Sequence, residues 1–257
     1  MTRPCRFVGV LPDIHVPLHD EKSLGAVCDY AADVWWDEVV ILGDFLDMDF
    51  ASKFAEGMVR QRAGKTFRKD ADAGQHVLDQ ILAAFRKKNK NAAATLLEGN
   101  HEYRIQRVLD ANPEYEGLIE VPELLRLSER GVKWVPFWST GEMYRTGKLR
   151  YIHGRWTNKY HAQKHVDMMG CNVAYGHTHD VQQFSKELMG DDKTTSAWSL
   201  GCLCLYKQPY LRGAPTRWQH AFGEAWVMPN GYFNLHVTRI FQHSFIGLRN
   251  PVKVYKR

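Results

Sequence analysis

Residues 7–15 read FVGVLPDIH, a short apolar run that ends in an aspartate and a histidine. The same arrangement recurs at residues 39–44 (VVILGD), 94–101 (ATLLEGNH), 149–154 (LRYIHG) and 173–179 (VAYGHTH). Continuous apolar runs of this length are typical of strands buried on both faces. Ligands of α/β proteins bind beyond the carboxyl ends of such strands. The pattern therefore predicts buried strands whose ends share one site.

Stretches with helical spacing separate these runs. Leu24, Val27, Cys28 and Ala31 form one apolar stripe, and a longer stripe lies between residues 76 and 85. The segment 50–90 is expected to be mostly helical, with a break near Gly64, and to overhang the site. Alternating strands and helices predict an α/β fold.

The pattern changes after Gly176. Strands are expected at residues 182–187, 195–200, 221–228 and 232–240, separated by turn signals at 189–192 and 229–231. We expect these strands to form an antiparallel second sheet that packs on the first. The whole chain, residues 1–257, is expected to be a single domain.

Composition sets the broad class of the protein. Hydrophobic residues make up 44% of the 257 residues and charged residues 25%, values that are ordinary for a globular protein. No apolar run approaches the roughly 20 residues that cross a bilayer, and no apolar signal segment follows the start. We therefore expect a cytoplasmic protein with no membrane partner. The net charge of +5 suits an anionic substrate, although many proteins share this bias.

Seven side chains at the expected strand ends offer oxygen or nitrogen to a metal. They are Asp13, His15, Asp44, Asn100, His153, His177 and His179. A lone Asp or His in such a place is more often a turn former, but the ordered set predicts a metal site. Oxygen and nitrogen ligands suit divalent ions, and a carboxylate can bridge two ions about 3.5–4 Å apart. Glycines beside most of these residues let the backbone turn sharply.

The order of these motifs resembles a known family signature. The blocks are Asp13-x-His15, Gly43-Asp44-x-x-Asp47, Gly99-Asn100-His101-Glu102, His153-Gly154 and Gly176-His177-x-His179. They resemble the five-block signature of the calcineurin-like metallophosphoesterases, most closely the compact stand-alone members of bacteria and phages. The resemblance implies a two-sheet β-sandwich flanked by helices, in four layers α/β/β/α.

The resemblance also implies a dinuclear centre. Asp13, His15 and His179 would hold the first ion. Asn100, His153 and His177 would hold the second, and Asp44 would bridge the two. A hydroxide shared by both ions would attack phosphorus. Mn²⁺ is the favoured ion, with Fe, Zn, Ni and Mg as alternatives.

Four further residues are expected to assist catalysis. The resemblance implies that His101 lies near the leaving-group oxygen, as general acid or charge stabiliser, and that Asp47 orients His101. Glu102 would support the ligands from behind. The alternative for Asp47 is an N-cap of the following helix. Arg104 is the candidate phosphate-binding cation.

The sequence also departs from one branch of the family. The protein Ser/Thr phosphatases carry arginines where this chain has Met48 and Glu98, which argues against a protein-phosphatase role. The expected function is a phosphoester hydrolase, foremost a phosphodiesterase acting on DNA, RNA or nucleotides. The alternatives are a phosphomonoesterase acting on small phosphates or phosphoproteins, and a non-catalytic metal-binding scaffold. The sequence leaves the oligomeric state open.

Other candidates have simpler interpretations. The five cysteines predict free thiols, with Cys202 and Cys204 buried. His161 and His165 are expected on a solvated helix face beside Lys164. His76 is expected to be packed, and His220 to make a hydrogen bond in the core. The basic run of residues 60–69 is either a patch for polyanions or a solvated helix face.

Overall fold

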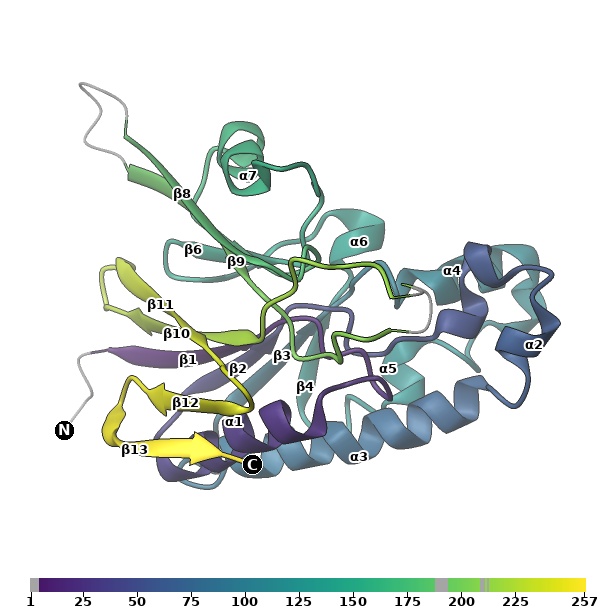
Figure 1. Cartoon of the computed structure of the whole chain (residues 1–257), viewed down its shortest axis with the longest axis horizontal. Helices are drawn as coiled ribbons and strands as arrows, with labels where there is room; N and C mark the ends of the chain where they lie inside the picture. The colour runs from purple at the N-terminus through teal and green to yellow at the C-terminus, as the bar shows by residue number, and fades with distance from the viewer. Residues whose placement is uncertain (1–4, 188–193, 209–210, 212) are drawn as a thin grey trace.

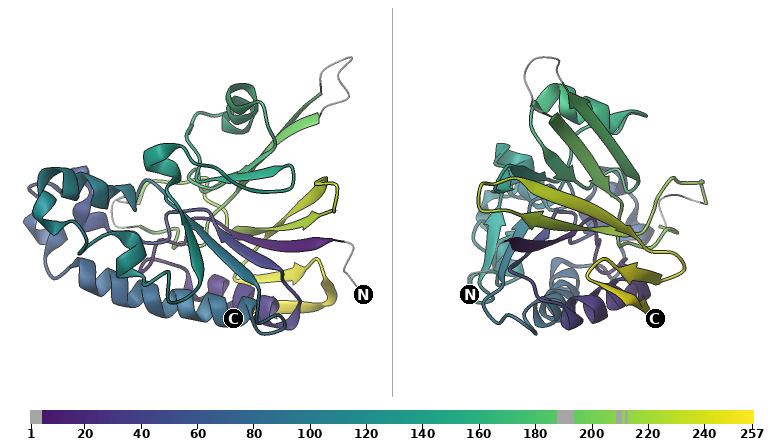
Figure 2. Two further views of the ribbon diagram at one scale, coloured as in Figure 1. Left: turned by 180° about the vertical axis from the view of Figure 1, so that it is seen from behind. Right: turned by 90° about the vertical axis from the view of Figure 1, so that its left-hand side faces the viewer.

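Two β-sheets stack face to face between layers of helices (Figures 1 and 2). The computed structural model describes residues 5–187, 194–208, 211 and 213–257. In the first sheet the strand order is β11-β10-β1-β2-β3-β4. Its strands are β1 (Arg6–Leu11), β2 (Glu38–Ile41), β3 (Ala93–Leu97), β4 (Val132–Val135), β10 (Ala221–Val227) and β11 (Phe233–Arg239). The expected two-sheet α/β architecture is confirmed.

The second sheet has the order β5-β6-β7-β9-β8. Its strands are β5 (Tyr144–Thr146), β6 (Leu149–Ile152), β7 (Val173–Tyr175), β8 (Val181–Glu187) and β9 (Thr194–Leu200). Strands β6, β7 and β9 run parallel to one another, and β5 and β8 pair antiparallel at the two edges. A hairpin of β12 (Ser244–Gly247) and β13 (Asn250–Lys256) lies beside the first sheet.

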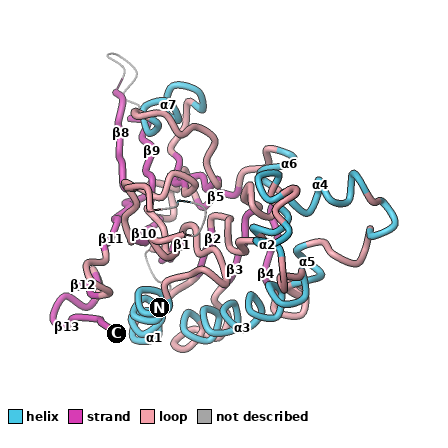
Figure 3. Tube along the Cα trace, turned by 45° about the vertical axis from the view of Figure 1, so that its right-hand side comes forward, coloured by secondary structure: helices cyan, strands magenta, loops and turns pink. Residues whose placement is uncertain are grey.

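Helices cover the outer face of each sheet (Figures 1 and 3). The first sheet is covered by α1 (Glu21–Asp33) and α3 (Phe67–Phe85), and the second by α6 (Phe137–Thr140) and α7 (His161–Met169). Asp20 caps α1 by accepting from the Ser23 amide, and Thr66 caps α3 by accepting from the Lys69 amide. The short helices are α2 (Val59–Arg62), α4 (Tyr103–Ala111) and α5 (Val121–Leu124).

Alternation of side chains along the strands of the first sheet builds a separate core on each of its two faces. On β1, Val8 and Val10 point between the two sheets, where they meet Tyr151 and Leu200. Gly9 points the other way, against the α-helical layer, and a Cβ there would lie 2.3 Å from the Phe85 ring. The strands are therefore buried on both faces, as their continuous apolar sequence predicts.

The expected composition of the second sheet is wrong. Strands β10 and β11 join the first sheet, because β10 pairs antiparallel with β1. Strands β6 and β7, which were expected in the first sheet, instead pair with β8 and β9 in the second, mixed sheet. Both sheets bury both faces, so apolar runs do not reveal which sheet a strand enters. The turn expected at 229–231 is present, with Gly231 at φ 83°, whereas the turn at 189–192 lies outside the described residues.

Several local expectations are now decided. The helical break near Gly64 is confirmed, between α2 and α3. Cys202 and Cys204 are buried free thiols, and the His220 ring donates from Nε2 to the Cys204 carbonyl at 2.7 Å, as expected. His76 is exposed and bonds only to Gln80 among the described residues, so its expected packing is wrong.

The expected solvated face of α7 is also wrong. His161 and His165 are 3% and 0% exposed, because this face of α7 packs on the second sheet. His165 stacks on Tyr175 with ring centroids 3.9 Å apart, and the Tyr175 hydroxyl donates to His161 Nδ1 at 2.6 Å. Lys164 lies on the opposite, exposed face of α7 with Gln163, Asp167 and Met168, so its exposure does not predict that of the two histidines.

The described part of the chain contains no helix of the length and apolar character that a bilayer crossing requires.

Replacing Phe85 by alanine tests the core between α3 and the first sheet. Phe85 is 1% exposed and its ring lies 5.0 Å from that of Trp36. Phe85→Ala is expected to lower the free energy of unfolding in urea by about 3–5 kcal/mol. Phe241→Ala is the matched control, since Phe241 is 67% exposed, and its effect should stay within about 0.5 kcal/mol. Equal losses would contradict the packing described.

Candidate metal centre

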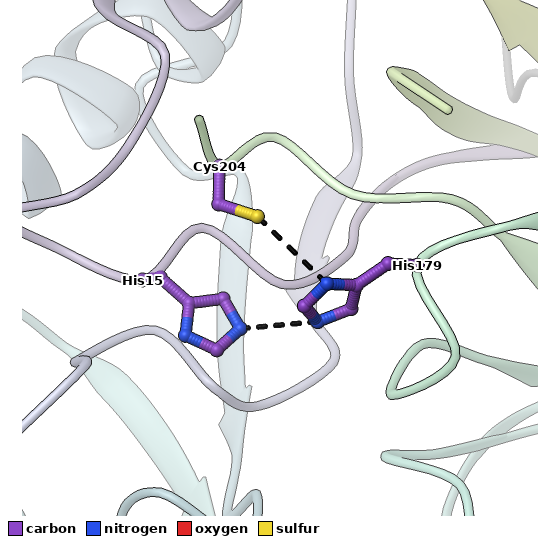
Figure 4. A group of neighbouring side chains, drawn as sticks. All are labelled: His15, His179 and Cys204. Atoms are coloured by element: carbon purple, nitrogen blue, oxygen red, sulfur yellow. Dashed lines mark hydrogen bonds between the residues drawn. The ribbon is translucent and has the colours of Figure 1, made fainter. Parts of the chain in front are cut away.

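Four of the predicted ligands converge in one buried group. The ligand atoms of Asp13, His15, Asp44 and His179 all lie within 4.8 Å of one another. The Nε2 atoms of His15 and His179 are 3.2 Å apart, as Figure 4 shows, and His179 Nε2 is 3.2 Å from Asp13 Oδ1. Asp13 and His15 follow β1, Asp44 follows β2 and His179 follows β7.

The other predicted ligands form an adjoining group. Asp44, His153 and His177 have ligand atoms within 4.8 Å of one another. His153 Nε2 lies 3.3 Å from Asp44 Oδ2 and 3.0 Å from Asn100 Oδ1. Asp44 belongs to both groups. The structure thus brings all seven predicted ligands together, with Asp44 in the place that a bridging carboxylate would take.

Hydrogen bonds behind the rings fix which nitrogen faces the centre. His15 donates from Nδ1 to Asp47 Oδ1 at 2.9 Å, and His153 donates from Nδ1 to the Leu42 carbonyl at 2.9 Å. In the neutral ring of each, the lone pair is therefore on Nε2, and this neutral form is the one that binds a metal. His15 Nε2 faces His179 Nε2, and His153 Nε2 faces a carboxylate oxygen of Asp44, an arrangement that a shared cation relieves. The donor set therefore fits divalent ions.

The electrostatics of the centre favour positive charge. Burial disfavours the charged form of His153, but the Asp44 carboxylate outweighs this and raises the His153 pKa to about 9. Burial also favours protonated Asp44, yet His101 and His153 hold its pKa well below the usual value. For His177, burial and the neighbouring His153 lower the pKa to about 3, so that ring is neutral and able to bind an ion.

The backbone at the ligands is unusual. Five of the seven, Asp13, His15, Asp44, His177 and His179, have φ of 34°, 57°, 45°, 69° and 60°. Non-glycine residues rarely adopt this left-handed region, which costs roughly 1–3 kcal/mol each and is concentrated at functional sites. The surrounding structure therefore holds these side chains in an aimed conformation.

Two glycines leave room for ligand carboxylates. A Cβ at Gly99 would lie 2.2 Å from Asp44 Oδ1, and one at Gly176 would lie 2.0 Å from Asp13 Oδ2. Sharp turns explain Gly43 and Gly154, with φ of 92° and 124°, as expected from the sequence. At Gly99 and Gly176 the requirement is close approach instead.

Glu102 supports the centre from behind. Its buried carboxylate accepts from the backbone amides of Asp44 (2.9 Å), Leu46 (2.8 Å) and Gly99 (2.8 Å). It therefore ties the loop after β2 to the loop after β3. Burial, with a smaller contribution from the Asp44 charge, raises the Glu102 pKa to about 7.

Asp47 contacts two histidines. Its Oδ1 lies 2.9 Å from His15 Nδ1 and 3.3 Å from His101 Nδ1. The alternative interpretation of Asp47 as an N-cap is wrong, because Met48 occupies the cap of the following 3-10 helix η1 (Asp49–Ala51).

His101 and Arg104 form a pair beside Asp44. The His101 amide donates to Asp44 Oδ1 at 2.8 Å, and its ring donates from Nδ1 to the Asp47 carbonyl at 2.7 Å. Arg104, on α4, donates from Nη2 to His101 Nε2 at 2.8 Å and from Nη1 to the Asp47 carbonyl at 2.7 Å. The four residues expected to assist catalysis therefore lie around Asp44 or its immediate neighbours.

Three side chains beside the ligands have no counterpart in the sequence motifs. The Trp138 ring lies 5.3 Å from that of His177, and the Trp218 ring lies 4.3 Å from that of His179. Cys204 Sγ is 3.9 Å from His179 Nδ1 (Figure 4), and it lies within 4.8 Å of ligand atoms of both His15 and His179. Trp138 and Trp218 lie outside the strand-end blocks, so no local pattern indicates them.

No family model matches the chain. It is similar to the Gene 54 protein of Mycobacterium phage D29, at 27% identity over 228 residues, covering 83% of this chain and 86% of that protein. The Gene 54 protein of Mycobacterium phage L5 is 26% identical over 227 residues, with the same coverage of 83% and 86%. Neither name states an activity.

Among solved structures, the chain is similar to Vps29 of Cryptosporidium parvum. The identity is 13% and the TM-score 0.46, covering 99% of this chain and 98% of that one. Vps29 of Entamoeba histolytica complexed with Zn²⁺ is 12% identical with a TM-score of 0.42, covering 98% of each chain. These likenesses are too weak for a role to be transferred from them.

Replacing Asp47 tests whether it orients His15 as a ligand. Asp47→Asn is expected to weaken Mn²⁺ binding by roughly 10–100-fold in titration calorimetry, because the amide holds the His15 N–H less firmly. Asp49→Asn is the matched control, since Asp49 pairs with Lys65 away from the ligands. Unchanged Mn²⁺ affinity in Asp47→Asn, with the fold intact, would exclude this role.

Proposed function

We propose that the chain is a dinuclear metal-dependent phosphodiesterase of the calcineurin-like type. The observation that carries the proposal is the position of the Asp44 carboxylate, which belongs to both groups of buried ligands. Mn²⁺ is the proposed ion, and Fe, Zn, Ni and Mg remain alternatives because the converging ligands are oxygen and nitrogen. When bound, two such ions supply positive charge that polarises a phosphoryl group and activates water.

The chain's own residues divide the remaining work. Asp13, His15 and His179 would hold one ion, and Asn100, His153 and His177 the other, with Asp44 shared. Glu102 and Asp47 would keep the ligand loops and the His15 ring in place, through the hydrogen bonds described above. Because these contacts exist before substrate arrives, little reorganisation would accompany the reaction.

His101 and Arg104 are proposed to face the leaving-group oxygen together. The His101 ring donates from Nδ1 to a carbonyl and accepts at Nε2 from Arg104. In this state Nε2 has no proton to give, whereas the guanidinium adds fixed positive charge. Of the two roles expected for His101, this arrangement favours charge stabilisation over general acid catalysis.

Removing the Arg104 guanidinium tests this pair. Arg104→Ala should lower kcat for a bis-aryl phosphodiester by roughly 10²–10³-fold in Mn²⁺-loaded protein, since a charge donor at the developing oxyanion is lost. Arg107→Ala, on the same helix but paired with Glu56 on the surface, is the matched control and should leave kcat unchanged. A kcat equally high in both variants would remove Arg104 from the reaction.

Diesters are favoured over monoesters because the two positions that carry arginines in the protein phosphatases offer no cation here. Met48 is fully buried, and Glu98 accepts from the Ser139 amide and hydroxyl at 2.7 Å each, so neither position offers a cation. A phosphomonoester dianion carries one more charge than a diester and gains more from paired arginines. The single guanidinium of Arg104 suits the diester monoanion.

A substrate panel tests this preference. Mn²⁺-loaded protein should turn over a bis-aryl phosphodiester and oligonucleotides at least tenfold faster than aryl phosphate monoesters, because Met48 and Glu98 offer no cation to the extra monoester charge. Initial rates at equal substrate concentration measure the ratio. Asn100→Ala should abolish both activities, which excludes a contaminating phosphatase. Faster monoester turnover would favour the phosphomonoesterase alternative. Inertness with Mn, Ni, Zn and Mg alike would favour a metal-binding scaffold.

A further inference from the structure

A pocket of roughly 450 Å³ opens beside the metal centre. Three segments line it: residues 157–159 together with His161 before and at the start of α7, residues 177, 178 and 180 after β7, and residues 216–218 before β10. The segments are distant in sequence and meet only in the folded chain. The volume falls within the range of small-molecule and nucleotide sites, about 300–1,000 Å³.

The pocket is continuous with the proposed site of reaction. His177, a proposed ligand of the second ion, forms part of its wall. Trp218 lies in the same wall and meets the ring of His179, a proposed ligand of the first ion, edge to face at 4.3 Å. A substrate whose phosphate lies at the metal centre would therefore extend its next group into this pocket.

The free charge of the pocket is positive. Lys159 and Arg217 line it and are exposed, and neither is paired with a carboxylate among the residues that the structure describes. The acid in the wall, Asp180, is already paired with His161, whose Nε2 lies 3.0 Å from its Oδ1. The lining thus carries two cations and one carboxylate, a net positive charge that suits an anionic chain.

The remaining lining combines one aromatic ring with small polar groups. Trp218 supplies an indole, and Thr157, Asn158, Thr178 and Thr216 supply hydroxyl and amide groups. Cations along the phosphates and aromatic rings for the bases are what single-stranded nucleic-acid sites combine. A base paired within a duplex cannot enter such a pocket unless it is flipped out.

We infer that this pocket binds one nucleotide of a single-stranded nucleic acid, adjacent to the phosphodiester at the metal centre. The base packs on Trp218, and Lys159 and Arg217 contact the neighbouring phosphate. The inference rests on the proposed function and names its substrate class.

A binding experiment without turnover tests the pocket. The probe is a fluorescein-labelled thymidine decamer, and its anisotropy is followed with Mn²⁺-loaded protein in a His101→Ala background. Adding Trp218→Ala or Arg217→Ala should weaken binding at least tenfold, since stacking of one base contributes roughly 1–3 kcal/mol. Arg145→Ala is the matched control, because Arg145 is exposed on β5 outside this pocket, and it should change the Kd less than twofold.

Activity measurements separate this inference from the proposed function. With His101 restored, Arg217→Ala and Lys159→Ala should lower kcat/KM for the decamer about tenfold, by raising KM, and leave a bis-aryl phosphodiester within twofold. If the Trp218 and Arg217 variants bind the decamer normally while diester hydrolysis is normal, the inference about the pocket is wrong and the proposed function stands. Pocket-dependent binding without hydrolysis of any diester would overturn the proposed function alone. Equal affinity for a duplex of the same sequence would overturn the single-strand assignment.

Discussion

Buried lone pairs that face one another are the constraint on which the rest of this site depends. The Nε2 atoms of His15 and His179 lie 3.2 Å apart, and His153 Nε2 lies 3.3 Å from Asp44 Oδ2. The Nδ1–H groups of His15 and His153 already donate to the Asp47 carboxylate and the Leu42 carbonyl, respectively. Unpaired polar atoms in a dry interior are costly, so positive charge must enter the cluster. Protons supply it in the metal-free protein, where the Asp44 carboxylate raises the His153 pKa to about 9, and divalent ions can replace them.

The arrangement is maintained by groups that do not face the ions. Glu102 is bound to three backbone amides of two loops, and Asp47 contacts the rings of His15 and His101. Left-handed backbone at five ligands would relax in an unsupported loop. The close approach of Gly99 to Asp44 and of Gly176 to Asp13 fixes these carboxylates further. The geometry is thus set by the fold itself, and the proposed reaction would need little reorganisation of the site.

The sequence predicts the ligands well, because they depend on local signals, but it does not predict which strands pair over long range. The ligands could be identified because each follows an apolar run, so one short stretch of sequence indicates both the strand and the ligand at its end. The pairing of the strands could not be predicted, because β1, β6 and β7 have similar apolar sequences although β1 belongs to the first sheet and the other two to the second. The exposure predicted for His161 and His165 from the neighbouring Lys164 is wrong, because the burial of a helix face depends on what packs against it. Trp218 contacts His179 from the loop before β10, and no sequence pattern links two residues so far apart in the chain.

The ligands come from both layers of the sandwich. Asp13, His15, Asp44 and Asn100 follow strands of the first sheet, whereas His153, His177 and His179 follow strands of the second. An ion held between Asp44 and His153 would therefore join two layers that otherwise meet through apolar contacts. Mass action then couples the cohesion of the sandwich to the free ion concentration, by about 2.7 kcal/mol when that concentration is 100 times the Kd. A chelator would then loosen the whole molecule as well as emptying the proposed metal centre.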